Sequence, residues 1–241
     1  MSRTRSRLWI AGVLLVAAAL LLYRSGKPLW KPMADRATGQ RTVETVLRDL
    51  GPAAEARMKP HFDKASVPFP PSRLALLGFK AEKRLEVWAG AADGPWRHVR
   101  DYPVLAASGR PGPKLREGDG RVPEGVYRIE LLNPQSRYHL SLRLDYPNAF
   151  DRAQAATEGR TSLGGDIYIH GGAVSIGCLA MGDEAVEELF VLAARTGLPN
   201  VRVILAPADL RAESASGGLV REPGWVGELY AIIRAELQPF R

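Results

Sequence analysis

One sixteen-residue stretch, DIYIHGGAVSIGCLAM at residues 166–181, constrains this chain more than any other part of its sequence. It contains the only cysteine in 241 residues, Cys178, and a histidine, His170, eight positions before it. Residues 167–169 are apolar and predict a short buried strand, which the glycine pair at 171–172 ends with a sharp turn. The loop that follows then brings the thiol back toward the end of the strand, where the imidazole lies.

A lone thiol with an upstream imidazole is typical of nucleophilic catalysis. A free thiol has a pKa near ~8.5 and is mostly protonated at neutral pH, so a nucleophilic cysteine needs a base beside it. We therefore expect His170 to be the base for Cys178, and the backbone N–H groups of Gly177 and Cys178 to stabilise an oxyanion. The alternative is a small buried hydrophobic residue, which is what most single cysteines are. A zinc site is disfavoured because no paired ligand spacing joins the thiol to the four histidines, His61, His98, His139 and His170.

The segment from His170 to Cys178, HG followed by S-x-G-C, resembles the active-site signature of the L,D-transpeptidase catalytic domain (YkuD-type) family. Its short interval resembles the YafK-like branch of that family in particular. The resemblance implies that Cys178 attacks a peptidoglycan stem peptide, that His170 is the general base and acid, and that the carbonyl of Gly171 orients the imidazole. Ser175 would support the loop by hydrogen bonds, and neither a metal nor an organic cofactor is implied. The sequence departs from the wider family at Ile176, where most members have a second histidine.

Further motifs follow one another in the order found in the family and extend the resemblance over roughly residues 40–207. They include LEVW at 85–88, KLREGD at 114–119, PEGVY at 123–127 and YPN at 146–148. We expect a strand-rich, mixed-sheet α+β domain that resembles the catalytic fold of this family, with flanking helices and an N-terminal membrane segment. We divide the chain accordingly into a signal peptide or membrane anchor (1–25), a linker (26–40), a helical lead-in that packs on the catalytic domain (41–79), the catalytic domain itself (80–207), and a C-terminal loop and helix (208–241).

The formal charge of +7 is confined to the N-terminal part of the chain. Residues 1–41 contain eight basic side chains and one acidic one, whereas the other 200 residues contain 25 of each. A nucleic-acid-binding surface is therefore not expected. Residues 8–23 form an uncharged apolar run, which predicts either an uncleaved anchor in the inner membrane or a signal peptide. Either alternative places the catalytic part outside the cytoplasm, in the cell envelope, where it would be periplasmic or extracytoplasmic.

Hydrophobic periodicity predicts a helical lead-in followed mainly by strands. A helix is expected over 40–50, resuming at 53–59 and ending at Pro60, and the first strands are expected at 84–89 and 96–102 as a hairpin. Further along the chain the patterns predict strands at 125–132, 138–146 and 201–205, and helices at 183–196 and 225–237. The acidic residues of the 183–196 helix are expected to face solvent.

Two irregular segments carry the candidate substrate contacts. Residues 108–123 are rich in glycine, proline and charge, which is typical of a functional loop, and residues 146–152 predict a turn at the rim of the pocket. The alternative is that their polar groups are solvated charges or only stabilise the turn. The candidates are Lys114, Arg116, Arg121, Asn148 and Arg152.

Four functions remain open from these residues. The first is acyl transfer through a thioester, in which an amine accepts the stem peptide and the cell wall is cross-linked or remodelled. The second is a hydrolase of the same fold, in which water resolves the thioester and a peptide or protein–peptidoglycan link is cleaved. The third is a cell-wall-binding module without catalysis, which the intact Cys178, His170 and Gly177 disfavour. The last is a membrane-tethered structural domain.

Overall fold

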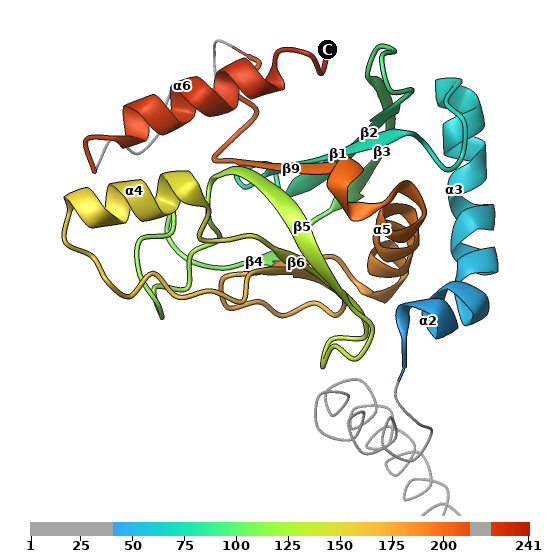
Figure 1. The fold of residues 1–241 in the computed structure, drawn as a ribbon, viewed down its shortest axis with the longest axis horizontal. Coiled ribbons are helices and arrows are strands. Elements are labelled where there is room, and N and C mark those ends of the chain that lie inside the picture. Colours follow the sequence, from blue (N-terminus) through green and yellow to red (C-terminus); the bar gives the residue numbers. More distant parts are fainter. Residues whose placement is uncertain (1–40, 213–222) are drawn as a thin grey trace, which may run out of the picture. The chain divides into compact units, whose positions relative to one another are not determined.

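The computed structural model describes residues 41–212 and 223–241 (Figure 1). The predicted membrane segment at 8–23 and the predicted linker lie outside the described residues. Within the described ranges, no helix is long and apolar enough to cross a membrane. The described residues from Thr42 onward form one compact unit.

In the described part of the chain nine strands form one mixed sheet. The strands are β1 (Arg73–Phe79), β2 (Arg84–Gly90), β3 (Arg97–Pro103), β4 (Ala106–Ala107), β5 (Gly125–Asn133), β6 (Ser141–Leu144), β7 (Tyr168–His170), β8 (Leu179–Ala180) and β9 (Val201–Ala206). Their order is β3-β2-β1-β9-β5-β6-β7-β8-β4. The β1–β9 and β7–β8 pairs are parallel, and the remaining pairs are antiparallel. The expected strand-rich, mixed α+β architecture is confirmed.

Helices cover both faces of the sheet (Figure 1). They are α2 (Val43–Asp49), α3 (Gly51–Ala65), α4 (Ala149–Thr157), α5 (Asp183–Thr196) and α6 (Val226–Leu237). Alternate side chains of β1 enter two different cores. Leu74 and Leu76 pack with α2, α3 and α5, whereas Leu77 and Phe79 pack with α6. The centre of the sheet is therefore buried on both faces, and the helices clamp it from either side.

The expectation that strands begin only at residue 84 is wrong, because β1 precedes them and lies near the middle of the sheet. Its sequence, RLALLGF, is a continuous apolar run, and six of its seven residues are buried. A strand that is covered on both faces has no polar face, so its sequence does not alternate. This strand belongs to the segment that we predicted as a helical lead-in.

The helix over residues 51–65 passes through Pro60, where we expected it to end. Proline removes one backbone N–H from the helical ladder and is costly in a helix interior. Met58 and Phe62 lie on either side of Pro60 and are 2% and 1% exposed. Burial of these two large side chains in the core outweighs the local loss.

Two expectations between residues 138 and 157 also need correction. The predicted strand at 138–146 is regular only over β6, and His139 has a positive φ of 74° just before it. The predicted turn at 146–152 continues into the helix α4. Asn148 is the N-cap of this helix, and its side chain and that of Asp151 bond each other's backbone N–H groups. This reciprocal pair satisfies two N–H groups at the helix start.

We expected the acidic residues of α5 to face solvent, and for Glu188 this expectation is wrong. Glu188 is completely buried, and its carboxylate accepts hydrogen bonds from Arg57 Nε at 2.6 Å and Arg100 Nη1 at 2.7 Å. The Tyr102 hydroxyl donates to the same carboxylate. Glu188 thus joins α5 to α3 and β3, which supports the helix that follows the predicted active-site stretch.

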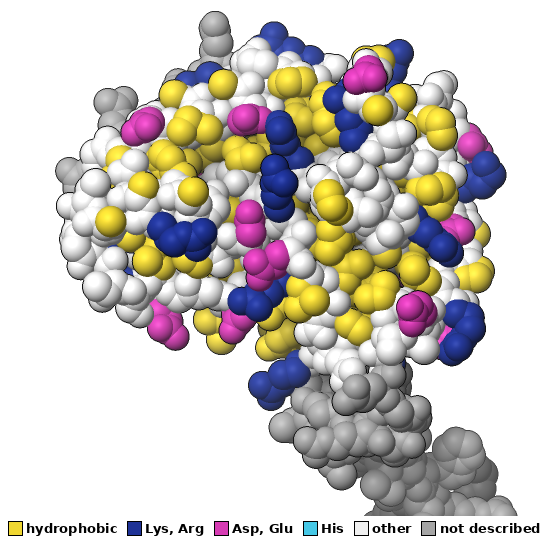
Figure 2. Space-filling model, in the orientation of Figure 1, with side chains coloured by type: hydrophobic (Ala, Val, Ile, Leu, Met, Phe, Trp, Pro, Cys, Tyr) yellow, Lys and Arg dark blue, Asp and Glu magenta, His cyan; other side chains and the backbone are white. Residues whose placement is uncertain are grey.

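The molecular surface mixes charges of both signs. On the face drawn in Figure 2, lysine and arginine side chains are interspersed with acidic and apolar ones and do not form one continuous basic area. This distribution agrees with the equal numbers of acidic and basic residues in the last 200 residues of the sequence.

Candidate active site

Strand register brings His170 and Cys178 to the same side of the sheet. β7 pairs in parallel with β8, with Ile169 opposite Leu179 and His170 opposite Ala180. Cys178 precedes β8 by one residue and is therefore level with Tyr168. Because side chains alternate between the two faces of a sheet, Cys178 projects from the same face as His170. Both residues also line one cavity.

His170 is the last residue of β7 and is 3% exposed. Its Nδ1 lies 2.6 Å from the carbonyl oxygen of Gly171, which is the contact that the family resemblance implied. A carbonyl only accepts hydrogen bonds, so Nδ1 carries the proton and Nε2 has a free lone pair. Burial lowers the pKa of His170, and the Gly171 carbonyl opposes this shift. The imidazole is therefore neutral near pH 7 and is able to accept a proton through Nε2.

The ring of Tyr138 stacks on the imidazole of His170, with centroids 4.6 Å apart and an angle of 29° between the planes. Sequence analysis did not single out Tyr138 as a site residue. Its position in a period-two apolar pattern indicated only a half-buried strand. The stacked ring restricts rotation of the imidazole and, together with the Gly171 carbonyl, fixes its orientation.

The thiol of Cys178 is held by the chain just before β7. The backbone N–H of Tyr168 donates to Sγ at 3.4 Å, and the thiol donates to the carbonyl of Asp166 at 3.6 Å. Burial raises the pKa of the thiol, an effect larger than the opposing ones of the Tyr168 N–H and the positive charge of Lys114. The two candidate catalytic residues are both described, and no hydrogen bond joins them. The resting pair is a neutral thiol and a neutral imidazole.

The two backbone N–H groups predicted to bind an oxyanion already have partners. Gly177 N donates to Ser108 Oγ at 2.6 Å, and Cys178 N donates to Ser175 Oγ at 2.9 Å. Ser175 Oγ also donates to the carbonyl of Cys178 at 2.5 Å, so this side chain bonds both backbone groups of Cys178. Gly177 has a φ of 94°, a conformation that glycine adopts without strain. An oxyanion at this position has to replace or share these two hydroxyl contacts.

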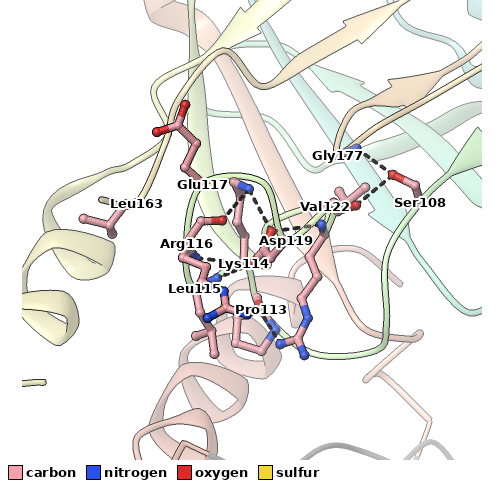
Figure 3. Close-up of polar contacts among 12 residues, drawn as sticks. Ser108, Pro113, Lys114, Leu115, Arg116, Glu117, Asp119, Val122, Leu163 and Gly177 are labelled. Carbon is pink, nitrogen blue, oxygen red and sulfur yellow. Dashed lines mark hydrogen bonds and ion pairs between the residues drawn. The ribbon is translucent and has the colours of Figure 1, made fainter. Parts of the chain in front are cut away.

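The glycine-rich loop at 108–123 is organised around the carboxylate of Asp119 (Figure 3). Lys114 Nζ donates to Asp119 Oδ1 at 2.8 Å, and three backbone N–H groups donate to the same carboxylate, those of Leu115, Arg116 and Arg121. Burial alone would raise the pKa of Asp119, but these hydrogen bonds outweigh it and hold the pKa below its usual value. The loop is thus an ordered structure with its own polar centre.

This loop also contacts the active-site stretch. Ser108 Oγ donates to the carbonyl of Gly120 at 2.7 Å while it accepts from Gly177 N, so a single hydroxyl joins the loop to the residue before the cysteine (Figure 3). Ser108 was missed by sequence reasoning, because serine in a glycine-rich segment is equally typical of any surface loop.

The loop after β7 is anchored to the start of α5. Asp183 Oδ1 accepts a hydrogen bond from Gly172 N at 2.9 Å. A Cβ atom on Gly171 would lie 2.5 Å from the carbonyl oxygen of Tyr138 and 2.8 Å from Asp183 Oδ1. The close approach of these groups therefore requires glycine at position 171, beside the imidazole of His170.

The cavity that contains the two candidate catalytic residues has a volume of about 280 Å³. Its lining comes from three parts of the chain. They are the end of β5 and its connection to β6 (Asn133, Ser136, Arg137, Tyr138), the strands β6 and β7 (Ser141, Tyr168, His170), and the loop before β8 (Val174, Ser175, Ile176, Cys178). The side chain of Ile176, at the position of the missing second histidine, is 88% exposed.

The five residues predicted as substrate contacts do not line this cavity. Lys114 is 7% exposed and is paired with Asp119, and Arg121 Nη1 donates to the carbonyl of Pro113. Asn148 Nδ2 donates to the carbonyl of Val126, and the Arg152 guanidinium bonds the carbonyl of Pro147. Arg116 is exposed on the loop. Direct contact of these residues with substrate stays a prediction. No group of acidic, histidine or cysteine side chains in the described ranges is placed to hold a metal ion.

Comparison with known proteins gives matches of three kinds. The family model for the L,D-transpeptidase catalytic domain (YkuD) matches residues 79–204. Two curated relatives, each called "Putative L,D-transpeptidase YafK", from Escherichia coli K12 and E. coli O157:H7, are 35% identical over 134 residues. That alignment covers 54% of this chain and 52% of the relative, so the chain spans about half the length of the curated relatives it matches.

Solved structures resemble the fold more distantly. The helical cell shape determining protein Pgp2 from Campylobacter jejuni is 26% identical, with a TM-score of 0.47 over 57% of this chain and 48% of that one. Bd1075 from Bdellovibrio bacteriovorus is 20% identical, with a TM-score of 0.41 over 70% of this chain and 55% of that one.

Proposed function

This chain belongs to the L,D-transpeptidase catalytic domain family, and on that premise we propose that it is a cysteine acyltransferase acting on peptidoglycan stem peptides. The observation that carries the proposal is the joint placement of Cys178 and His170. Both project from one side of the β7–β8 pair into one cavity, and the imidazole is held with its basic nitrogen free. This is the arrangement that thiol nucleophiles with an imidazole base require.

In the first half-reaction, Sγ of Cys178 attacks the carbonyl carbon of an amide in the peptide stem. Because the resting thiol and imidazole are both neutral, the S–H proton moves to Nε2 of His170 as the S–C bond forms. The Gly171 carbonyl, which accepts from Nδ1–H, stabilises the imidazolium produced in this step. We propose that a hydrogen bond between Sγ and Nε2 forms when substrate binds, since catalytic hydrogen bonds often tighten only in the complex.

The tetrahedral intermediate carries its negative charge on the former carbonyl oxygen. We propose that this oxygen binds the N–H groups of Gly177 and Cys178 and displaces the hydroxyls of Ser108 and Ser175 from them. Collapse of the intermediate breaks the C–N bond, and the leaving amine takes the proton from His170 Nε2. The product is a thioester on Cys178.

In the second half-reaction, an amine acceptor attacks the thioester carbon while His170 removes its proton. The C–S bond breaks, and the thiol recovers a proton from the imidazolium. A water molecule in place of the amine gives hydrolysis by the same steps, so the acceptor decides between the two products. With Ile176 in place of a second imidazole, His170 is the one imidazole that lines the described cavity.

The proposed substrate, peptidoglycan, determines where in the cell we expect the catalytic unit to act. Peptidoglycan lies outside the cytoplasmic membrane, so the catalytic unit acts in the cell envelope, periplasmic or extracytoplasmic. The apolar run at residues 8–23 supports export, either as an anchor in the membrane or as a cleaved signal.

The proposal is tested by incubating the full chain with defined stem peptides and weighing the products. A tetrapeptide donor plus an amine acceptor should give a cross-linked product that has lost the leaving amino acid. Without an acceptor, release of the shortened peptide would instead assign the chain as a hydrolase. No product from any stem peptide, with a folded protein and a reduced thiol, would contradict both.

A further inference from the structure

The cavity has one charged residue in its described lining, Arg137. It lies in the connection between β5 and β6, and the lining also includes the apolar side chains of Val174 and Ile176. The other lining residues of this connection are neutral and polar or aromatic, and no carboxylate lines the cavity among the described residues. A negatively charged ligand entering here would therefore meet a cation in the lining. The carboxylate of Asp166 also acts on the thiol, but it does not line the cavity and pairs with Arg143 at 3.4 Å.

Arg137 is exposed and has neither an ion pair nor a hydrogen bond with any described residue. By contrast, Arg143 on the adjoining strand pairs with Glu130 at 3.0 Å and Asp166 at 3.4 Å. The guanidinium is always charged and offers a planar fork of N–H donors that matches a carboxylate. Its donors are thus available for a ligand in the cavity.

The backbone around Arg137 is held in place by short-range hydrogen bonds. Asn133 Oδ1 accepts from Gln135 N at 2.9 Å, and Ser136 Oγ accepts from Tyr138 N at 3.1 Å. Tyr138, the next residue, stacks on the imidazole of His170. Arg137 therefore projects from a structured turn that directly contacts the proposed catalytic base.

We propose that Arg137 binds a carboxylate of the peptide substrate and so selects anionic acyl donors for Cys178. The peptide nature of this substrate rests on the proposed function, whereas the preference for an anion follows from the cavity alone. Lys114 also acts on the thiol through its charge, but it is paired with Asp119 and does not line the cavity. Arg116 and Arg121 do not line the cavity either, so we assign the contact with the ligand to Arg137.

Two alkylating reagents of similar size test the anion preference without any peptide. Iodoacetate is negatively charged and iodoacetamide is neutral, and both alkylate the single cysteine of the chain. In Arg137→Gln the ratio of the iodoacetate rate to the iodoacetamide rate should fall about threefold to tenfold relative to the parent, and less at high salt. Arg137→Lys should keep most of the ratio, since it keeps the charge.

The matched control is Arg97→Gln, which removes an exposed arginine on β3 that does not line the cavity. It should leave the ratio at the parent value. An unchanged ratio in Arg137→Gln, or an equal fall in Arg97→Gln, would overturn the proposal. Because both reagents react with the same thiol, a general change in thiol reactivity or stability affects both rates equally and cancels in their ratio.

Turnover of stem peptides provides the second measurement. For a tetrapeptide with free carboxylates, Arg137→Gln should raise KM about tenfold with little change in kcat, and for the fully amidated peptide it should change neither. If no stem peptide turns over but the alkylation ratio still falls, the peptide substrate is wrong and the anion site stands. If peptides turn over without this discrimination and the ratio is unchanged, the anion site is wrong.

Discussion

Asp119→Asn should destabilise the protein, because the carboxylate at this position organises the whole loop at residues 108–123. The substitution keeps the size of the side chain but removes the charge that pairs with Lys114 Nζ. The side chains of Lys114 and Asp119 are only 6% and 10% exposed, so the ammonium group is left with little water to replace its partner. Loss of one member of a buried ion pair costs about 3–5 kcal/mol.

The expected loss is about 3 kcal/mol in the free energy of unfolding, the lower end of that range. Asparagine keeps one amide oxygen, which can still accept from some of the three backbone N–H groups that Asp119 bonds in the parent. The pKa of Asp119 is held below its usual value, so its stabilising effect is present above the pKa of the unfolded chain and is lost as the pH falls through the folded pKa. The difference between parent and variant should therefore be full at pH 7 and shrink in acid.

Urea unfolding of the full chain at pH 7, followed by circular dichroism, measures this loss. Asp93→Asn is the matched control, because Asp93 is exposed in the turn between β2 and β3, and it should leave the free energy of unfolding unchanged. Adding Lys114→Met to Asp119→Asn should recover about 1–2 kcal/mol, since the unpaired ammonium group is then removed. The reasoning would be refuted if Asp119→Asn lowered the free energy of unfolding by less than about 1 kcal/mol, or if the double variant were less stable than Asp119→Asn alone.

Three further predictions follow from other buried polar groups. His170→Gln should slow the reaction of Cys178 with iodoacetamide at pH 7 by at least about tenfold, with partial recovery at high pH, and an unchanged rate–pH profile would show that another group activates the thiol. Glu188→Gln should lower the free energy of unfolding by about 3 kcal/mol, because it leaves Arg57 and Arg100 without their buried partner. The control Glu184→Gln changes an exposed residue of α5 and should cost far less. Equal losses of the two variants in urea unfolding would contradict this role of Glu188. Burial raises the pKa of Asp151 to about 6, so the folded state binds its proton more tightly than the unfolded chain does, and the stabilisation is lost as the pH rises through that value. The stability of the parent relative to Asp151→Asn should therefore be greater at pH 5 than at pH 7 by about 1 kcal/mol, and a difference of the opposite sign would rule out the raised pKa.

The local structure of the candidate active-site stretch could be predicted from the sequence because its signals are local. A short apolar strand, a glycine pair and a single cysteine lie within sixteen residues, and the strand pairing of β7 with β8 follows from their proximity in the chain. The contact between His170 Nδ1 and the Gly171 carbonyl is also local, since the two residues are adjacent.

The remaining features depend on partners that are distant in sequence. Glu188 looks like an ordinary acidic residue at a helix start, and its burial depends on Arg57 and Arg100, which are 131 and 88 positions away. Arg137 is one of many arginines, and only the fold places it at the cavity. The helix α4 did have a local signal, the Asn-x-x-Asp capping pair at 148–151, although we predicted only a turn over these residues.

The central claim, that Cys178 forms a thioester with the acyl part of a stem peptide, is tested most directly by the mass of the protein itself. The full chain should be mixed with a tetrapeptide donor in the absence of an amine acceptor, quenched in acid after short times and weighed intact. We predict an added mass equal to the donor minus its leaving amino acid, located on the peptide that contains Cys178 and released by hydroxylamine. The adduct should be absent from Cys178→Ala, which should remain folded. Turnover of the donor by Cys178→Ala, or an adduct on any residue other than Cys178, would contradict the account.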